Sequence, residues 1–310
     1  MKNLSFISRN GLRRRLLLCW LGLILTQCQQ LPPPRPVPPF ESLLQAVAEF
    51  KRYEKSDLYH HPMPKDATGQ NAFRATLMRL ENYAHENPEQ DRDIVLYTQA
   101  ECLARLGEYA SAVDHFMQVE AMPESPLAPK AESRRKIYMR IESALRKPVF
   151  ASANLQAELQ ALQNIRARLG QLAKEWDGKW EHLLARRELE QAERETALFL
   201  FRNRYVMERG ANRAIDLVTE MIEDHAESRL VYAHRLLLGE FYFTLAKDQA
   251  LLNPPDRLGF DSELCYLLLE KAHAQFLIVA RADGYFEKPE GIALIEAVEA
   301  FRQNLRQSLR

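Results

Sequence analysis

The chain of 310 residues holds only 11 glycines, and its prolines are unevenly distributed. No proline occurs between residue 149 and residue 253. Because glycine loosens helices and proline breaks them, a long stretch that is poor in both predicts helices. The scarcity of glycine also argues against the strained loops that many active sites use.

Recognisable catalytic motifs are missing as well. The sequence has no HExxH, no GxSxG, no glycine-rich phosphate loop and no cluster with metal-ligand spacing. His60-His61 is a histidine pair without a third ligand near it in the sequence. We therefore expect no enzymatic activity, no cofactor and no metal. An enzyme whose catalytic residues are brought together only by folding is an alternative.

Charge of one sign does not dominate the chain, which has 42 basic and 42 acidic residues. Residues 1–27 hold five of the basic groups and no acidic one, so the remainder has 37 basic and 42 acidic residues, a net charge of about −5. Neutralising a row of phosphates requires a basic patch. We expect no nucleic-acid partner, and nothing in the sequence indicates a small-molecule substrate.

Long hydrophobic runs are also missing. Three arginines, Arg13 to Arg15, precede an apolar run over residues 16–25, which is too short to span a bilayer because a transmembrane helix needs about 20 residues. A basic region before a short apolar run predicts a secretory signal peptide over residues 1–27. A buried core helix is the alternative.

Residues 25–28, Leu-Thr-Gln-Cys, resemble the lipobox of bacterial lipoproteins, although that family prefers a small residue in place of Gln27. The resemblance implies that Cys28 is acylated and becomes the N-terminus. Gln29 in place of aspartate implies, by the lipoprotein sorting rule, a lipid anchor in the outer membrane facing the periplasm. Residues 28–40 are rich in proline, which predicts an extended polyproline tether. A ligand for a proline-binding domain is the alternative.

The strongest internal pattern lies between residues 93 and 126. Apolar and small residues recur there at spacings of three and four, as on one face of each of two helices that meet at a glycine. These positions are Leu96, Ala100, Leu103, Gly107, Tyr109, Ala112, Phe116 and Val119. The pattern resembles a tetratricopeptide repeat, a helix–turn–helix of 34 residues. With the P-x-S-P-x-A-P-x-A turn at residues 123–131, it is similar to periplasmic repeat proteins such as the lipoprotein subunit of the outer-membrane β-barrel assembly machinery and the periplasmic coordinator of envelope constriction.

Weaker copies of the pattern predict tetratricopeptide-like repeats over residues 41–147 and 198–310. Leu238-Gly239 and Tyr242 fit a first helix, and Ala272, Phe276 and Val279 fit a second one, with an insertion near 247–260 between them. A last helix over residues 289–309 is expected to be the cap. A weaker repeat unit is expected at residues 198–221, because six residues there fall in one helical register. They are Leu198, Phe201, Tyr205, Ala214, Val218 and Met221.

The central segment, residues 148–197, shows a different period. Leu155, Leu162, Leu169, Trp176 and Leu183 recur every seven residues, as in a coiled coil. Arg186, Glu190 and Arg194 follow at spacings of four, which predicts an exposed helix. We expect a long helical pair that is solvated and docked on the repeats. A coiled-coil arm that dimerises or clasps a partner is the alternative.

Two further sets of residues fit the interior of a helical body. Cys102 and Cys265 lie in apolar helical runs and are expected to be buried thiols, although an exported protein could also form a disulfide. An aromatic set indicates either a groove lining or a core of stacked helices. Its members are Tyr232, Phe241, Tyr242, Phe243 and Tyr266.

These patterns predict an all-α fold, a tetratricopeptide-like solenoid of helical hairpins interrupted by a long central helical pair. The resemblance implies a lipid-anchored periplasmic scaffold that binds envelope proteins during envelope assembly or secretion. The alternative is an accessory lipoprotein that regulates an inner-membrane sensor or signalling complex through its central helices.

Overall fold

The computed structural model describes residues 39–54, 57, 59–61, 70–148 and 154–309. The expected signal peptide, Cys28 and most of the tether lie outside the described residues, as does the stretch 62–69. The chain divides into two compact units, Met1–Ser42 and Leu43–Arg310. Of the first unit, only the start of one helix is described, so the features below belong to the second unit.

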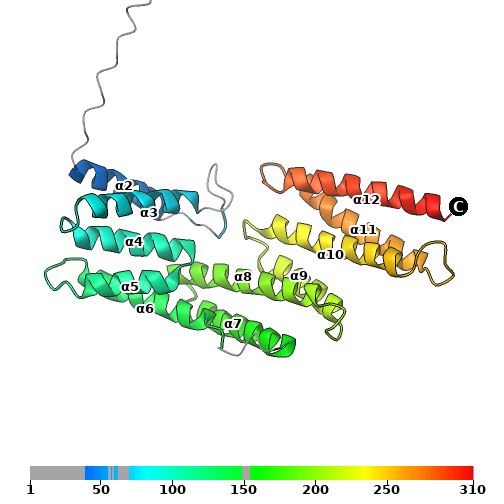
Figure 1. The fold of residues 1–310 in the computed structure, drawn as a ribbon, viewed down its shortest axis with the longest axis horizontal. Helices are drawn as coiled ribbons and strands as arrows, with labels where there is room; N and C mark the ends of the chain where they lie inside the picture. The colour runs from blue at the N-terminus through cyan, green and yellow to red at the C-terminus, as the bar shows by residue number, and fades with distance from the viewer. Residues whose placement is uncertain (1–38, 55–56, 58, 62–69, 149–153, 310) are drawn as a thin grey trace, which may run out of the picture. The chain divides into compact units, whose positions relative to one another are not determined.

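The described residues form eleven helices and no strand, which confirms the all-α prediction (Figure 1). The helices run in chain order as follows: α2 (Pro39–Glu54), α3 (Asn71–Glu86), α4 (Arg92–Leu106), α5 (Tyr109–Glu120), α6 (Ala128–Leu145), α7 (Leu155–Glu175), α8 (Trp180–Arg202), α9 (Gly210–Asp224), α10 (Val231–Leu252), α11 (Ser262–Ala280) and α12 (Lys288–Ser308).

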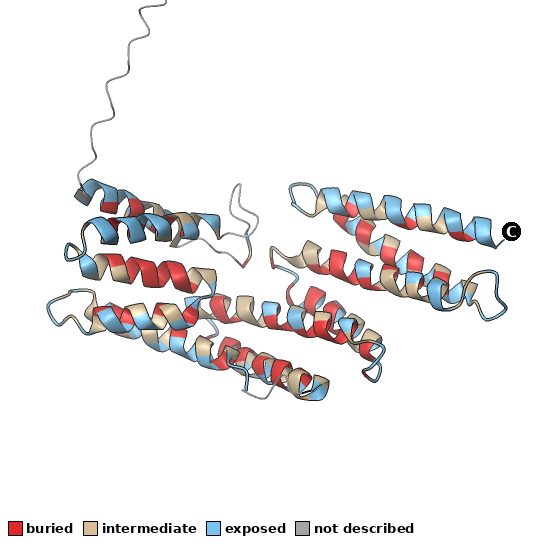
Figure 2. Ribbon diagram, in the orientation of Figure 1, coloured by how far each residue is buried: buried red, intermediate tan, exposed pale blue. Residues whose placement is uncertain are grey.

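Each helix from α3 to α12 packs against the next one along the chain. Leu43 on α2 packs in one cluster with Leu80 on α3. The largest apolar cluster is built from α4 to α8, a second from α7 to α10 and a third from α10 to α12. Buried residues accordingly form stripes on the helices (Figure 2). The core is therefore a series of overlapping clusters along the chain, as expected when chain neighbours supply most contacts.

The residues of the tetratricopeptide-like pattern occupy the first of these cores. Ala100, Ala112 and Phe116 are fully buried, Leu103 and Tyr109 are buried, and Leu96 is partly buried. Gly107 ends α4 with φ +86°, a left-handed conformation that favours glycine and lets the chain turn into α5. The amide of Glu108 donates to the carbonyl of Leu103 at 2.9 Å, which closes the turn.

The α10–α12 region repeats this arrangement. Ala272, Phe276 and Val279 on α11 are fully buried. Gly239 on α10 packs against Phe276 so closely that a Cβ atom at position 239 would lie 2.4 Å from the ring. The expected insertion contains less loop than the range 247–260, because α10 continues to Leu252 before the chain turns.

The central segment forms two long helices, α7 and α8, that pack against each other as expected, but its heptad positions do not form a single seam. Gly178, with φ +73°, lies in a short turn between α7 and α8. The heptad positions therefore do not form one seam, because Leu183 lies on α8 while Leu162 and Leu169 lie on α7. Leu162, Leu169 and Trp176 are buried in the two neighbouring cores. Helix α8 also runs past the expected boundary at residue 197.

The prediction was wrong for one residue of the register that runs from Leu198 to Met221. Tyr205 was expected on a packed helical face, but it is 64% exposed and lies in the turn after α8. Helix α8 ends at Arg202, and α9 begins at Gly210 and packs against α8. A Cβ atom on Gly210 would lie 2.9 Å from the Cα atom of Arg204, so the turn that contains Tyr205 is tight.

The remaining expectations about the interior can be compared directly. Cys102 and Cys265 are free and fully buried, and burial together with Glu101 raises the pKa of Cys102 to about 12. Phe241 and Phe243 are core residues, while the three tyrosines of the aromatic set pack at the core margins. Among the described residues, no helix is long and apolar enough to cross a membrane.

Candidate functional site

A cavity of about 380 Å³ is lined by every second helix from α2 to α8. Helices α2, α4, α6 and α8 contribute to its wall, together with Asp57 and Tyr59 from the connection between α2 and α3. The lining residues are Glu54, Asp57, Tyr59, Ala104, Arg105, Arg134, Tyr138, Trp180, Leu183, Leu184 and Arg187.

Arg105 on α4 supplies a hydrogen-bond donor at this cavity. Its terminal Nη2 donates to the carbonyl of Glu54 at 2.5 Å, which ties α4 to the end of α2. Its Nε is buried and has no hydrogen-bond partner among the described residues. An unpaired buried donor costs free energy, so an acceptor that reached Arg105 Nε would bind favourably.

Beneath Arg105, a buried carboxylate holds three other side chains in place. Glu101 is fully buried and accepts hydrogen bonds from the hydroxyls of Tyr97 and Tyr138, at 3.1 and 3.0 Å, and from Arg134 Nε at 2.9 Å. Burial and the negative charge of Glu101 raise the pKa of both tyrosines, so they remain protonated donors. We call Tyr97, Glu101, Arg134 and Tyr138 the polar tetrad.

Helix α8 forms the opposite wall. The Trp180 ring lies 4.3 Å from Arg134 Cζ, a cation–π contact that joins this wall to the tetrad. Arg187 lies 2.9 Å from the Tyr109 hydroxyl and 2.8 Å from a carboxylate oxygen of Glu188. Burial alone would lower the pKa of Arg187. Tyr109 and Glu188 raise this pKa by more than burial lowers it, so the guanidinium stays charged.

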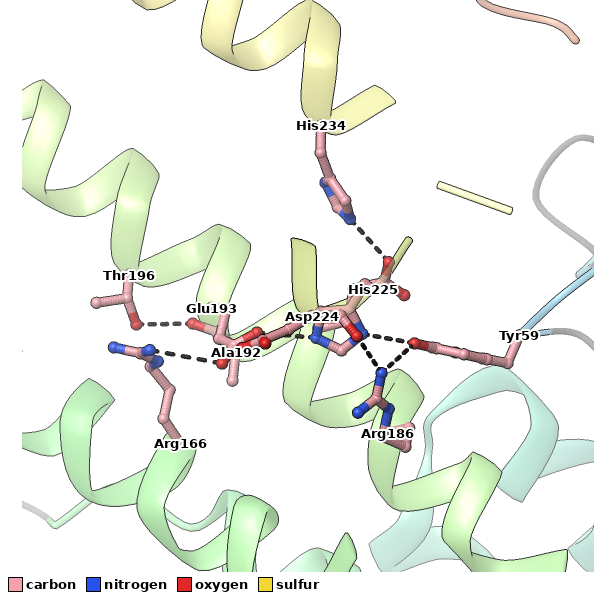
Figure 3. A network of polar contacts seen from close by, with 10 residues as sticks. Tyr59, Arg166, Arg186, Ala192, Glu193, Thr196, Asp224, His225 and His234 are labelled. Atoms are coloured by element: carbon pink, nitrogen blue, oxygen red, sulfur yellow. Dashed lines mark hydrogen bonds and ion pairs between the residues drawn. The ribbon is translucent and has the colours of Figure 1, made fainter. Parts of the chain in front are cut away.

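Tyr59 closes the remaining side of the cavity and is almost fully buried, at 4% exposure. Its hydroxyl lies 2.7 Å from His225 Nδ1 and 2.9 Å from Arg186 Nη2 (Figure 3). Its carbonyl accepts a hydrogen bond from the amide of Arg229 at 2.8 Å. His225 Nε2 lies 3.0 Å from Glu193 on α8. We call Tyr59, Arg186, Glu193 and His225 the Tyr59 clasp. The clasp joins the connection between α2 and α3 to the turn between α9 and α10.

A second histidine–glutamate pair lies beside the clasp. Glu190 Oε1 is 2.7 Å from His234 Nε2, and both side chains are buried. Burial alone would raise the pKa of Glu190, but hydrogen bonds from His234 and Ser228 lower it below its usual value. The prediction that Arg186, Glu190 and Arg194 mark an exposed helix was therefore wrong for Glu190, because this residue faces α10.

The sequence-based predictions did not include the residues that build the site. Arginines and a tryptophan on helices are normally read as solvated or core positions, and no motif joins Arg105, Arg134 and Trp180. No sequence signal marks Glu101, because its burial depends on contacts with Arg134 and Tyr138 on α6. His60, singled out in the sequence, bonds Asp57 and lies 3.6 Å from Glu227. Among the described residues, no group of three or more histidine, cysteine, aspartate or glutamate side chains could hold a metal ion.

The arrangement combines an apolar and aromatic wall with charged groups whose positions are fixed by buried partners. Such a combination fits binding sites, in which apolar contacts supply affinity and a few polar groups fix orientation. No family model, no curated protein and no solved structure matches the chain.

Proposed function

We propose that the protein is a lipid-anchored periplasmic scaffold of tetratricopeptide-like helical hairpins, and that its inner face binds a segment of another envelope protein. The observation that carries this proposal is the composition of the cavity wall, which comes from α2, α4, α6 and α8. In the proposed solenoid, these are the first helices of successive hairpins. In stacked hairpins, equivalent helices line one continuous face, which is the surface that repeat proteins use for binding.

The cavity sets the chemistry of the bound segment. Trp180, Leu183 and Leu184 offer contacts to an apolar side chain, and the positively charged guanidinium of Arg105, whose buried Nε has no partner among the described residues, favours a carboxylate or carbonyl oxygen nearby. An extended segment with an apolar residue next to an acidic one complements both features. Aromatic and arginine residues of this kind supply much of the binding free energy at protein interfaces.

The envelope location rests on the N-terminal sequence. The lipobox resemblance at Cys28 and the proline-rich segment after it support a body held away from a membrane by a stiff tether. Outer-membrane anchoring and a role in envelope assembly or secretion follow from the same resemblance.

Site-specific crosslinking tests the proposal in cells. A photoreactive phenylalanine analogue replaces Leu183 in the cavity, and a matched variant carries it at Met117, which is exposed on α5. We expect the Leu183 position alone to capture one peptide of an envelope protein, with an acidic residue beside an apolar one. Capture of the same proteins from both positions, or of none from Leu183, would contradict the proposal.

Direct binding then tests the chemistry of the site. A synthetic peptide with the captured sequence is titrated against the wild-type protein and two variants, Trp180→Ala and Arg105→Gln. We expect each variant to weaken binding at least about tenfold, because loss of a buried interface anchor or of a charged hydrogen bond costs more than 1 kcal/mol. The exposed-site variant Met117→Ala should leave the affinity unchanged.

A further inference from the structure

The hydrogen bonds around His225 favour one protonation state. If His225 is neutral with its proton on Nε2, then Nε2 donates to Glu193 and Nδ1 accepts from the hydroxyl of Tyr59. The Tyr59 oxygen in turn accepts from Arg186. Every donor in this chain of contacts then has an acceptor, and the distance of 2.7 Å between the Tyr59 hydroxyl and Nδ1 lies within hydrogen-bond range.

Protonation of His225 removes this match. Both ring nitrogens of an imidazolium donate, so Nδ1 can no longer accept from Tyr59. The Tyr59 oxygen would then receive donors from His225 and Arg186. Its own proton would have no acceptor at hydrogen-bonding distance among the described residues. Because Tyr59 and His225 are almost fully buried, an unpaired hydroxyl proton there is unfavourable.

Charged and titratable groups lie around His225 on every element that packs against it. Helix α8 contributes Glu190, Glu193 and Arg186, and Arg166 on α7 lies 3.5 Å from Glu193. The other groups are Asp224 at the end of α9, Asp57 and His60 from the α2–α3 connection, Glu227 and Arg229 from the α9–α10 turn, and His234 on α10.

We propose that the Tyr59 clasp is a pH-sensitive switch that is closed when His225 is neutral and is opened when His225 is protonated. Histidine is the side chain that ordinarily changes charge in the mildly acidic range. Tyr59 also lines the cavity, so opening the clasp removes one wall of the candidate binding site. The effect on binding rests on the proposed function, but the switch itself does not.

The amide of Arg229 provides a local readout, because it donates to the carbonyl of Tyr59 at 2.8 Å. Hydrogen exchange of the full chain is measured by mass spectrometry at about pH 8 and about pH 5.5, with correction for intrinsic exchange rates. We expect the protection of this amide to fall about tenfold or more on acidification. Equal protection at the two pH values would overturn the proposal.

Two variants assign the effect to the clasp. His225→Asn keeps an acceptor near the place of Nδ1 but cannot titrate, so protection should no longer depend on pH. The matched variant His115→Asn removes a histidine on α5 and should keep the wild-type dependence. If His225→Asn keeps the wild-type dependence, another group controls the contact and the proposal fails.

A third variant keeps the test decisive if His225→Asn does not fold. Tyr59→Phe removes only the hydroxyl, so Arg229 should show low protection at both pH values. Wild-type protection in Tyr59→Phe would overturn the proposal, because the hydroxyl would then not hold the contact. No partner protein is needed in these experiments, so their failure would leave the crosslinking result at Leu183 standing.

Discussion

The α4–α6 region and the α10–α12 region have the same core register and different polar content. Ala112, Phe116 and Val119 in the first region correspond to Ala272, Phe276 and Val279 in the second, and all six side chains are fully buried. The connections from α5 to α6 and from α11 to α12 also have the same pattern of turns. The apolar register is therefore a property that both regions need in order to pack.

The polar tetrad occurs in the first region alone. Its members Tyr97, Arg134 and Tyr138 correspond to apolar residues in the second region, and the counterpart of Glu101 is exposed. These counterparts are Leu236, Leu294, Val298 and the exposed Glu240. Because α10–α12 packs without buried polar groups at these positions, the fold does not require the tetrad. The tetrad instead occurs where the cavity lies, which supports a binding role for α4 and α6.

The largest expected effect tests the shared register. Phe116→Ala and Phe276→Ala should each lower the free energy of unfolding by about 3–5 kcal/mol, because a large buried ring is replaced by a void. Chemical denaturation measures both losses. The neighbouring variant Met117→Ala, at an exposed position on α5, should change stability by less than about 0.5 kcal/mol. A loss below about half a kcal/mol in Phe116→Ala would refute the repeat assignment.

The difference between the regions predicts a smaller and unequal pair of effects. Glu101→Gln should destabilise the protein by about 1–3 kcal/mol, because Arg134 and two tyrosine hydroxyls lose a buried carboxylate. Glu240→Gln should change stability by less than about 0.5 kcal/mol, since Glu240 is exposed. Urea denaturation of the two variants gives the comparison. Equal losses would mean that the tetrad is no more structural than its exposed counterpart.

Much of the fold could be predicted from spacing. The residues from Leu96 to Phe116 indicated two helices meeting at Gly107, because a period of 3.6 and a glycine at a helix end report directly on backbone geometry. The last helix was expected at 289–309 and lies at Lys288–Ser308. The central segment was harder, because seven-residue spacing continues across the turn at Gly178 as if no turn were there.

The site could not be predicted in the same way. Glu190, Glu193 and His225 are polar, and a polar residue on a helix is ordinarily assigned to solvent. What buries them is the meeting of α8 with the turn before α10 and with Tyr59, which lies more than a hundred residues away in the sequence. A single sequence carries no periodic signal for such contacts. The same reasoning explains the error at Glu190, where a spacing typical of exposed ion pairs belongs to a buried residue.

The smallest expected effect distinguishes the two regions at one position. Ala100 corresponds to Gly239, and a Cβ atom at position 239 would lie 2.4 Å from the Phe276 ring. Gly239→Ala should therefore destabilise the protein by overpacking, about 1–3 kcal/mol, offset by about 1 kcal/mol of better helix propensity. Ala100→Gly should cost about 1 kcal/mol for the opposite reason, since glycine weakens the helix.

A double-mutant cycle separates the two causes. Phe276→Leu shortens the side chain that the new Cβ atom would strike, so Gly239→Ala should cost less in that background, or even stabilise the protein. Thermal or urea denaturation of the four proteins gives the coupling between positions 239 and 276. If Gly239→Ala costs the same with Phe276 and with Leu at that position, the glycine is not there for close packing. Ala100 and Gly239 would then occupy equivalent backbone positions without a shared packing role.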